Sequence, residues 1–453
     1  MLTPLFVALL GCPSTDPVPA GPVRDTSPST ATAATGQAST ASSGSTGLTG
    51  STGLPTTAQT GDTAPPEPIT SVPTDAPPWT FSFGAPVSLS EAGGLRDSHA
   101  VGAGHGVGWL VGWTAEIPGG GTKSTALRLL GPDGNQWELP SQVRTDGPAI
   151  VSVGSEAAVA FGDIEGHRMG TLQVSATGQL GDVSWVDGSA APNLPFAVDA
   201  AATSDGSMWL LWSDVLWTVA MEEEDFAAAP DGAFRLAYVN PNGAFSGPVD
   251  VRHTTAPGGK HPPDIEVLPN DDVVYVVTER AAHDQPAQLA LYRLRDGHRV
   301  PLSTPGVDGS RSNMAVDALG RLAVVWREGA VTELKTYLSL FDSDLNQLVG
   351  PMELEPGWTS DRPTVVAHPE GWLLAWEKPL PMDSDWTGHR ELRVRLLAAD
   401  GLSWRTRTTL FPSTDRRRRP AFAHGPGGTL LLFEQGPNDD TFVRYLTIDV
   451  EAP

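Results

Sequence analysis

Five basic side chains stand at corresponding places in a repeated pattern, each shortly before an apolar run of the chain. They are Arg96, Lys260, Arg311, Arg362 and Arg419. Guanidinium and ammonium groups gathered around one opening bind anions such as a carboxylate or a sulfated sugar. The pattern therefore predicts a ring of cations, provided that the fold brings these five positions to one rim.

A second interpretation of the same cations is structural. Acidic residues end several of the following apolar runs, at Glu279, Glu328, Glu377 and Glu434. Two pairs, Arg362 with Glu377 and Arg419 with Glu434, are each 15 residues apart and bracket one hairpin. Such spacing favours cross-strand ion pairs, each of which stabilises its hairpin by about 1 kcal/mol or less. The sequence does not decide between a ligand-binding ring of cations and structural ion pairs.

Other candidate sites are weaker. Carboxylates cluster at 222–225, 383–386 and 438–440, but these clusters lack the ligand spacing of a calcium loop and are interpreted as solvated loops. His253 and His261 form no metal-ligand pattern. The sequence has no Gly-Lys-Ser/Thr phosphate loop and no Gly-x-Ser-x-Gly motif. No catalytic residue, metal ion or cofactor is predicted.

The element that must position the cations is a repeat. Similar apolar runs recur seven times, with steps of 48, 51, 66, 48, 50 and 57 residues. Their aligned positions are Trp113, Phe161, Trp212, Thr278, Trp326, Trp376 and Phe433. A period near fifty residues indicates a repeat architecture.

One unit shows what the repeat is. Apolar segments at 363–368, 372–377, 392–397 and 404–410 are joined by turns. Four antiparallel strands per fifty residues describe a blade of a β-propeller. The sequence therefore predicts an all-β, seven-bladed propeller, with six or eight blades as alternatives because the second and fourth copies are weak. The chain ends after three strands of its last unit, so residues 80–90 are expected to supply the fourth strand and close the ring.

One blade also resembles a known family. Arg362-Pro363, followed by Gly371-Trp372-Leu373-Leu374-Ala375-Trp376, is similar to the Arg-x-Pro and Gly-x-Leu-Leu-Ala-Phe pattern of sialidases. The resemblance implies a secreted glycoside hydrolase as an alternative function, with a pair of carboxylates at a set separation. The Ser-x-Asp-x-Gly-x-Thr-Trp box of that family does not occur here.

The N-terminus predicts where the protein is located. Residues 1–11 form a short apolar signal segment, and Leu9-Leu10-Gly11-Cys12 resembles the lipobox of bacterial lipoproteins. The resemblance implies cleavage before Cys12 and lipidation of this residue, which is the only cysteine of the chain; the alternative is an incidental cysteine. Residues 12–78, rich in Ser, Thr, Pro and Gly, are expected to be a disordered tether, and residues 79–453 form the propeller domain.

Composition narrows the class of partner. The formal charge is −24, which argues against nucleic acid because such binding needs a basic surface. The sequence thus predicts an exported monomer, anchored by lipid on Cys12 in the bacterial cell envelope, at the outer membrane or cell surface. We expect it to be a binding module for a protein or glycan ligand at the rim that carries the loops.

Overall fold

The computed structural model describes most of the chain after residue 78. The described residues are 79–90, 98–106, 108–116, 123–131, 136–138, 147–163, 166, 168–186, 193–216, 232–254, 262–280, 285–330, 333–357, 359–379, 390–406, 409–410, 417–436 and 441–453. They all belong to one compact unit, residues 63–453. Their regular elements are β-strands, and no helix in these ranges is long and apolar enough to cross a membrane.

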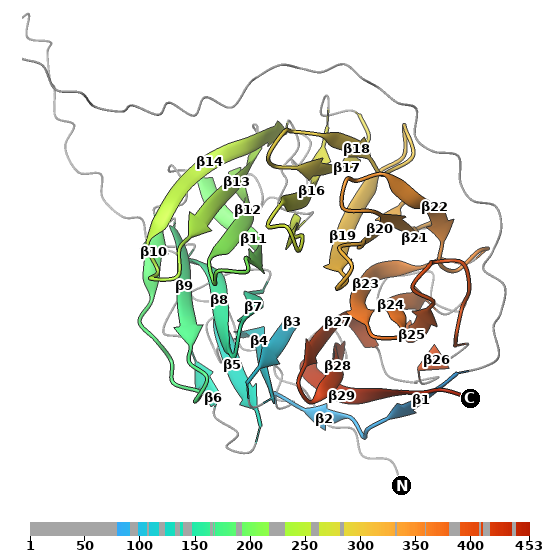
Figure 1. Ribbon diagram of the computed structural model, residues 1–453, viewed down its shortest axis with the longest axis horizontal. Helices are drawn as coiled ribbons and strands as arrows, with labels where there is room; N and C mark the ends of the chain where they lie inside the picture. The colour runs from blue at the N-terminus through green and yellow to red at the C-terminus, as the bar shows by residue number, and fades with distance from the viewer. Residues whose placement is uncertain are drawn as a thin grey trace, which may run out of the picture. The chain divides into compact units, whose positions relative to one another are not determined.

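Seven antiparallel sheets stand around a common centre, as Figure 1 shows. Each sheet has four strands in sequence order, apart from the last sheet, which borrows strands from the beginning of the domain. The strands β3, β7, β11, β19, β23 and β27 lie innermost (Figure 1), and β15 holds the same place in the strand order of its sheet. The predicted all-β, seven-bladed propeller is confirmed.

Within each blade, the strands follow one another from the innermost to the outermost. Blade 1 contains β3 (Ser98–His105), β4 (Gly108–Glu116), β5 (Lys123–Leu130) and β6 (Gln136–Glu138). Blade 2 contains β7 (Ala149–Val153), β8 (Glu156–Asp163), β9 (Arg168–Val174) and β10 (Ser184–Val186). Blade 3 contains β11 (Asn193–Ala202), β12 (Met208–Leu216), β13 (Gly232–Val239) and β14 (Phe245–Thr254). Blade 4 contains β15 (Asp264–Val267), β16 (Val273–Glu279), β17 (Gln288–Arg293) and β18 (Arg299–Pro301). Blade 5 contains β19 (Gly309–Val316), β20 (Leu322–Glu328), β21 (Lys335–Phe341) and β22 (Gln347–Glu353). Blade 6 contains β23 (Asp361–His368), β24 (Gly371–Pro379), β25 (Arg390–Leu397) and β26 (Thr409–Leu410). Blade 7 contains β27 (Arg417–Gly425), β28 (Gly428–Gln435) and β29 (Phe442–Glu451), with β1 (Thr80–Phe83) and β2 (Val87–Ser88) on its outer side.

The first and last strands of the domain close the ring. Phe81 pairs with Val450, and Val87 pairs with Tyr445, so both β1 and β2 lie antiparallel to β29. The N-terminal segment therefore covers the outer edge of the last blade, as the sequence predicts for residues 80–90. Covering this edge removes a row of unpaired backbone groups that would otherwise template aggregation.

Apolar packing between blades makes the core. One hydrophobic cluster lies at each of the seven junctions between neighbouring blades, including the junction of blade 7 with blade 1. In β20, Val324 packs toward blade 4 and Val325 packs toward blade 6. Both faces of a second strand are thus buried, which explains its near-continuous apolar sequence. Trp372 and Trp376 are fully buried against blade 5.

The glycine that begins β24 is required by the close approach of the third strand. Gly371 has φ +140°, and a Cβ atom at this position would collide with the carbonyl oxygen of Leu397. Gly108 begins β4 in blade 1 in the same way, against the carbonyl oxygen of Leu130. Glycine before the apolar run is therefore part of the blade pattern.

The fourth strand of blade 6 is shorter than the sequence suggests. Residues 404–410 are predicted as one strand, whereas β26 contains only Thr409–Leu410, and Trp404 makes an isolated bridge to Leu397. The backbone N–H of Leu396 donates to the Thr406 side-chain oxygen over 2.9 Å. A side chain thus takes a hydrogen bond that a backbone carbonyl would accept in a regular ladder.

Candidate anion-binding site

A repeated backbone irregularity positions the candidate cations. Five innermost strands carry a bulge near their start, with a non-glycine residue at positive φ inside it. These residues are His99 (55°), Ala197 (44°), Arg311 (50°), Arg362 (47°) and Arg419 (51°). The left-handed conformation costs about 1–2 kcal/mol in an L-residue, and a bulge re-aims a side chain. Three of the five predicted cations occupy this strained place.

Strand register makes the three arginine-bearing blades comparable. In each blade, the residue just before the arginine pairs with a residue of the second strand, and the pairs are Ser310 with Arg327, Asp361 with Glu377, and Arg418 with Glu434. Blades 6 and 7 therefore hold a carboxylate beside their arginine. Blade 5 holds another arginine at that position.

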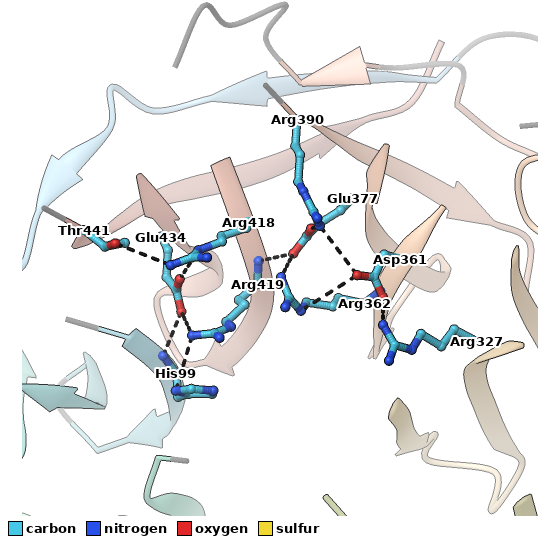
Figure 2. Close-up of polar contacts among 10 residues, drawn as sticks. All are labelled: His99, Arg327, Asp361, Arg362, Glu377, Arg390, Arg418, Arg419, Glu434 and Thr441. Carbon is cyan, nitrogen blue, oxygen red and sulfur yellow. Dashed lines mark hydrogen bonds and ion pairs between the residues drawn. The ribbon is translucent and has the colours of Figure 1, made fainter. Parts of the chain in front are cut away.

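In blade 6, Glu377 is the centre of an ion-pair network (Figure 2). Its fully buried carboxylate accepts from Arg362 Nη1 over 2.9 Å and also contacts Arg390 on the third strand. The backbone N–H of Arg419 in blade 7 donates to the same group over 2.6 Å. Burial alone would raise the pKa of Glu377, but Arg362 and Arg390 hold it well below its ordinary value.

In blade 7, Glu434 has the same role. Its fully buried carboxylate accepts from Arg419 Nη1 over 2.9 Å and from Arg418 Nε over 2.7 Å. The backbone N–H of His99 in blade 1 donates to it over 2.9 Å, as Figure 2 shows. The ion pairs predicted from the fifteen-residue spacing are present. Their carboxylates also accept a backbone N–H from the next blade, a contact that the spacing does not reveal.

Blade 5 departs from this pattern. Among the described residues, Arg311 makes no hydrogen bond and no ion pair, and its Nε is buried without a partner. Arg327, which replaces the expected carboxylate, pairs across the blade boundary with Asp361 over 2.7 Å (Figure 2). Glu328 instead accepts from Trp326 Nε1 over 2.7 Å. The arginine of blade 5 thus lacks the carboxylate that its two counterparts have.

Positive charge is in excess in this cluster. It contains six guanidinium groups, from Arg311, Arg327, Arg362, Arg390, Arg418 and Arg419, and three carboxylates, from Asp361, Glu377 and Glu434, which gives these nine side chains an excess of three positive charges. Burial, and then the nearby Arg362 and Arg327, lower the pKa of Arg311 to about 9. Arginine remains protonated at neutral pH. We call these nine residues the arginine layer.

The arrangement can bind an anion. A guanidinium group offers five N–H donors in a planar fork that matches a carboxylate, sulfate or phosphate. Arg311 makes no hydrogen bond or ion pair in the described part of the chain, its Nε is buried without a partner, and Asp361 attracts it only at longer range. The other arginines beside it raise the local potential although the whole chain is strongly acidic. An anion at Arg311 would relieve both the repulsion and the unsatisfied donors.

Sequence reasoning found part of the arginine layer. Arg311, Arg362 and Arg419 come together, whereas Arg96 and Lys260 lie outside the described residues, as do the acidic clusters, the His253 side chain and His261. Sequence reasoning missed His99, Arg327, Asp361, Arg390 and Arg418. The repeat did contain one signal for Arg327. At the position where blades 6 and 7 have Glu377 and Glu434, blade 5 has this arginine.

A chamber lies among the innermost strands. Its volume is about 440 Å³, and residues from all seven innermost strands line it. Its polar wall includes Asp199, Glu266, Asn313 and Thr364, between valine, alanine and isoleucine side chains. Asn313 and Thr364 are joined through the Asn313 Oδ1, which accepts from Thr364 Oγ1 over 3.0 Å. The chamber is polar enough to hold a ligand that forms hydrogen bonds.

The carboxyl groups around the chamber have raised pKa values. Burial raises the pKa of Asp199 to about 6. Burial and then the Asp199 charge raise the pKa of Glu266 to about 8, and they also raise that of Asp264. No group of three or more His, Cys, Asp or Glu residues in the described ranges could hold a metal ion. At neutral pH, Asp199 is therefore ionised, whereas Glu266 largely keeps its proton and can donate a hydrogen bond.

Comparison with known proteins gives structural likenesses only. No family model matches the sequence, and no curated protein matches it at a significant level. A protein of unknown function from Dyadobacter fermentans is 11% identical, with a TM-score of 0.48 over 82% of this chain and 99% of that chain. Trypanosoma rangeli sialidase is 12% identical, with a TM-score of 0.45 over 71% of this chain and 56% of that chain. The polysaccharide lyase Uly1 is 9% identical, with a TM-score of 0.44 over 75% of this chain and 88% of that chain. The chain is thus similar to several solved structures, and no activity is carried over from them.

Proposed function

We propose that this protein is a binding module whose arginine layer takes an anionic group of a glycan or protein ligand. The observation that carries the proposal is Arg311, which has no partner in the described part of the chain. A buried cation without a partner is destabilising, and the neighbouring blades show that the fold accommodates a carboxylate at the corresponding place. Arg311 is half-buried and interacts with Asp361 only at longer range, so pairing within the blade does not account for it, whereas ligand binding does.

The binding role is placed ahead of the hydrolase alternative. A glycoside hydrolase needs carboxylates that can reach the scissile bond. The three carboxylates of the arginine layer, on Asp361, Glu377 and Glu434, are fully buried in ion pairs. Because these carboxylates are held in ion pairs with arginines, they are not available for acid–base chemistry.

Replacing Arg311 with Asn tests the proposal, since Asn tolerates the left-handed conformation while losing the charge. The full chain and the Arg311→Asn variant would be applied to a panel of acidic glycans, neutral glycans and acidic peptides. We expect the wild type to bind acidic members, and the variant to bind them at least about tenfold more weakly, as for the loss of a charged hydrogen bond.

The stability of the same variant separates ligand binding from a structural role. Because Arg311 has no carboxylate partner among the residues that the structure describes, the free energy of unfolding of the variant should be unchanged or higher in chemical denaturation. Undiminished binding by the variant would falsify the proposal. A clear loss of stability would instead show that Arg311 serves the fold.

The lipid anchor belongs to the same proposal. Cys12 lies outside the described residues, and the support for lipidation is its position after Leu9-Leu10-Gly11. In cells fed a labelled fatty acid, the wild-type chain should carry label and fractionate with envelope membranes. The Cys12→Ser variant should lose the label and appear in the soluble fraction. Label that persists in the variant rules the anchor out.

A further inference from the structure

The second strand of blade 2 presents smaller side chains to the next blade than any other second strand does. On β8, Ala158 and Ala160 face blade 3 and share a cluster with Met208 of β12. At these two positions every other second strand carries at least one larger side chain, and these are Leu110, Trp209, Val274, Val325, Leu373 and Leu430. The junction of blades 2 and 3 therefore has room that the close-packed interior of a protein does not normally leave.

The third strand of blade 2 makes the same face polar. Gln173 pairs with Ala158, and Thr171 pairs with Ala160, so both β9 side chains also face blade 3. At the Thr171 position, the third strands of the other blades carry Leu127, Leu236, Leu291, Leu338, Val394 and Tyr445. Blade 2 thus has a small hydroxyl side chain where five other blades have an aliphatic one.

A pocket of about 410 Å³ occupies this junction. Ala158, Met208 and Val239 form part of its apolar wall. Its polar wall contains Thr171, Gln173, Asp182, Ser184, Asn240 and Asn242. The turns that follow β11 and β13 line it as well, so it lies at the end of the blades opposite to the arginine layer. It shares no lining residue with the chamber among the innermost strands.

Several polar groups of the pocket have hydrogen-bonding capacity that the fold does not use. Thr171 is only 4% exposed, and its hydroxyl group makes no hydrogen bond with a described residue. The side-chain oxygens of Asn240 and Asn242 both accept from the backbone N–H of Ala244 over 3.0 Å. This contact fixes the orientation of each amide, so the two amide nitrogens remain as donors without a described partner. A ligand would satisfy these groups.

The lining favours a neutral ligand that carries hydroxyl groups. Among the described residues of the wall, Asp182 is the one ionisable side chain, and none is Lys or Arg. On a chain of formal charge −24, such a pocket does not attract an anion. Hydroxyl and amide side chains donate and accept, as the hydroxyl groups of a sugar do. The aliphatic side chains of Ala158, Met208 and Val239 can cover the C–H face of a sugar ring, and the volume falls in the range of small-molecule sites.

We propose that this junction pocket is a second binding site, which takes a neutral sugar ring. The C–H face of the ring packs on Ala158 and Met208, and its hydroxyl groups bind Thr171, Asn240 and Asn242. The site is independent of the anion-binding function proposed above, because it lies at the other end of the blades and holds no cation among its described lining residues.

Saturation-transfer NMR on the full chain tests the inference with the methyl glycosides of glucose, galactose, mannose and N-acetylglucosamine. At least one of the four should bind, and titration gives its Kd. Thr171→Val keeps the shape of the side chain and removes only the free hydroxyl group, so it should weaken binding about fivefold, as for the loss of a neutral hydrogen bond. Ala158→Leu places in the pocket the side chain that blades 1, 6 and 7 carry at this position, and it should abolish binding.

The free energy of unfolding shows whether the variants keep the fold. Because the Thr171 hydroxyl group has no described partner, Thr171→Val should be at least as stable as the wild type. A matched control is Thr125→Val in blade 1. The Thr125 hydroxyl group is also buried without a partner among the described residues, but Thr125 does not line the pocket. This control should bind the glycoside as the wild type does.

The outcomes separate this pocket from the proposed anion site. Arg311→Asn should leave glycoside binding unchanged, and a loss of binding in that variant would place the sugar at the arginine layer and overturn the inference. The inference is also overturned if none of the four glycosides binds, or if the folded Thr171→Val and Ala158→Leu variants bind as tightly as the wild type. Neither result bears on acidic ligands at Arg311, whose binding is measured separately.

Discussion

Replacing Glu377 with Gln is expected to lower the free energy of unfolding by about 3–5 kcal/mol, the range for removing one partner of a buried ion pair. The carboxylate is fully buried and serves Arg362, Arg390 and the backbone N–H of Arg419. Gln keeps the size of the side chain, so the loss reports the missing charge rather than a cavity. Denaturant unfolding monitored by tryptophan fluorescence would measure it.

A matched control in the same blade is Glu370→Gln. Glu370 pairs with Arg405 over 2.9 Å, but its side chain is 45% exposed. Exposed ion pairs contribute about 1 kcal/mol or less, so this variant should stay close to the wild type. If the free energy of unfolding falls equally little in both variants, Glu377 is not the electrostatic centre that its contacts indicate.

The fold could be predicted because its determinants are local and repeated. A second strand buried on both faces has a continuous apolar run, as at residues 322–326, and Gly371 occupies a position where any side chain would collide with the third strand. Ring closure could be predicted for a different reason. The last unit lacks one strand, and a sheet edge left open is a hazard that the N-terminal segment can cover.

The arginine layer could be predicted only in part, because its decisive contacts cross between blades. Spacing within one hairpin reveals Arg362 with Glu377, since both residues belong to the same repeat. Spacing does not reveal that Arg327 reaches Asp361 of the next blade, or that Arg390 shares Glu377. Such contacts depend on the twist and packing of neighbouring sheets. The sequence therefore could not distinguish a paired arginine from an unpaired one.

The structure shows the ion-pair interpretation of the cations, and the proposed anion site depends on these ion pairs. Arg362 and Arg419 hold blades together through buried carboxylates, and in doing so they fix the surroundings of Arg311. Preorganised cations strengthen anion binding because they need no rearrangement when the ligand arrives. Structural ion pairs in two blades would thus preorganise the proposed site in the third.

Raising the pH from 5.5 to 9 is expected to destabilise the protein through Glu266, whose pKa is raised from 4.5 to about 8 by burial and then by the Asp199 charge. Between pH 4.5 and about pH 8, Glu266 is protonated in the folded protein and ionised in the unfolded chain. The stabilisation is therefore complete below pH 4.5 and is lost as the pH rises through 8. One pKa unit corresponds to about 1.4 kcal/mol, which gives a loss of at most about 3 kcal/mol over this range.

Comparison with the Glu266→Gln variant isolates this contribution, because Gln is neutral at every pH. The free energy of unfolding of both proteins would be measured between pH 5.5 and 9, and the difference between the two curves should shrink or reverse as the pH rises. Asp199 and Asp264 face the same region and titrate in both proteins, so their effect largely cancels in the difference. The Glu266 side chain is half-buried at the wall of the chamber, and water beside it reduces the effect below its limit. Parallel curves would show that Glu266 titrates at an ordinary pKa, and the carboxyl side of the chamber would then carry full negative charge at neutral pH.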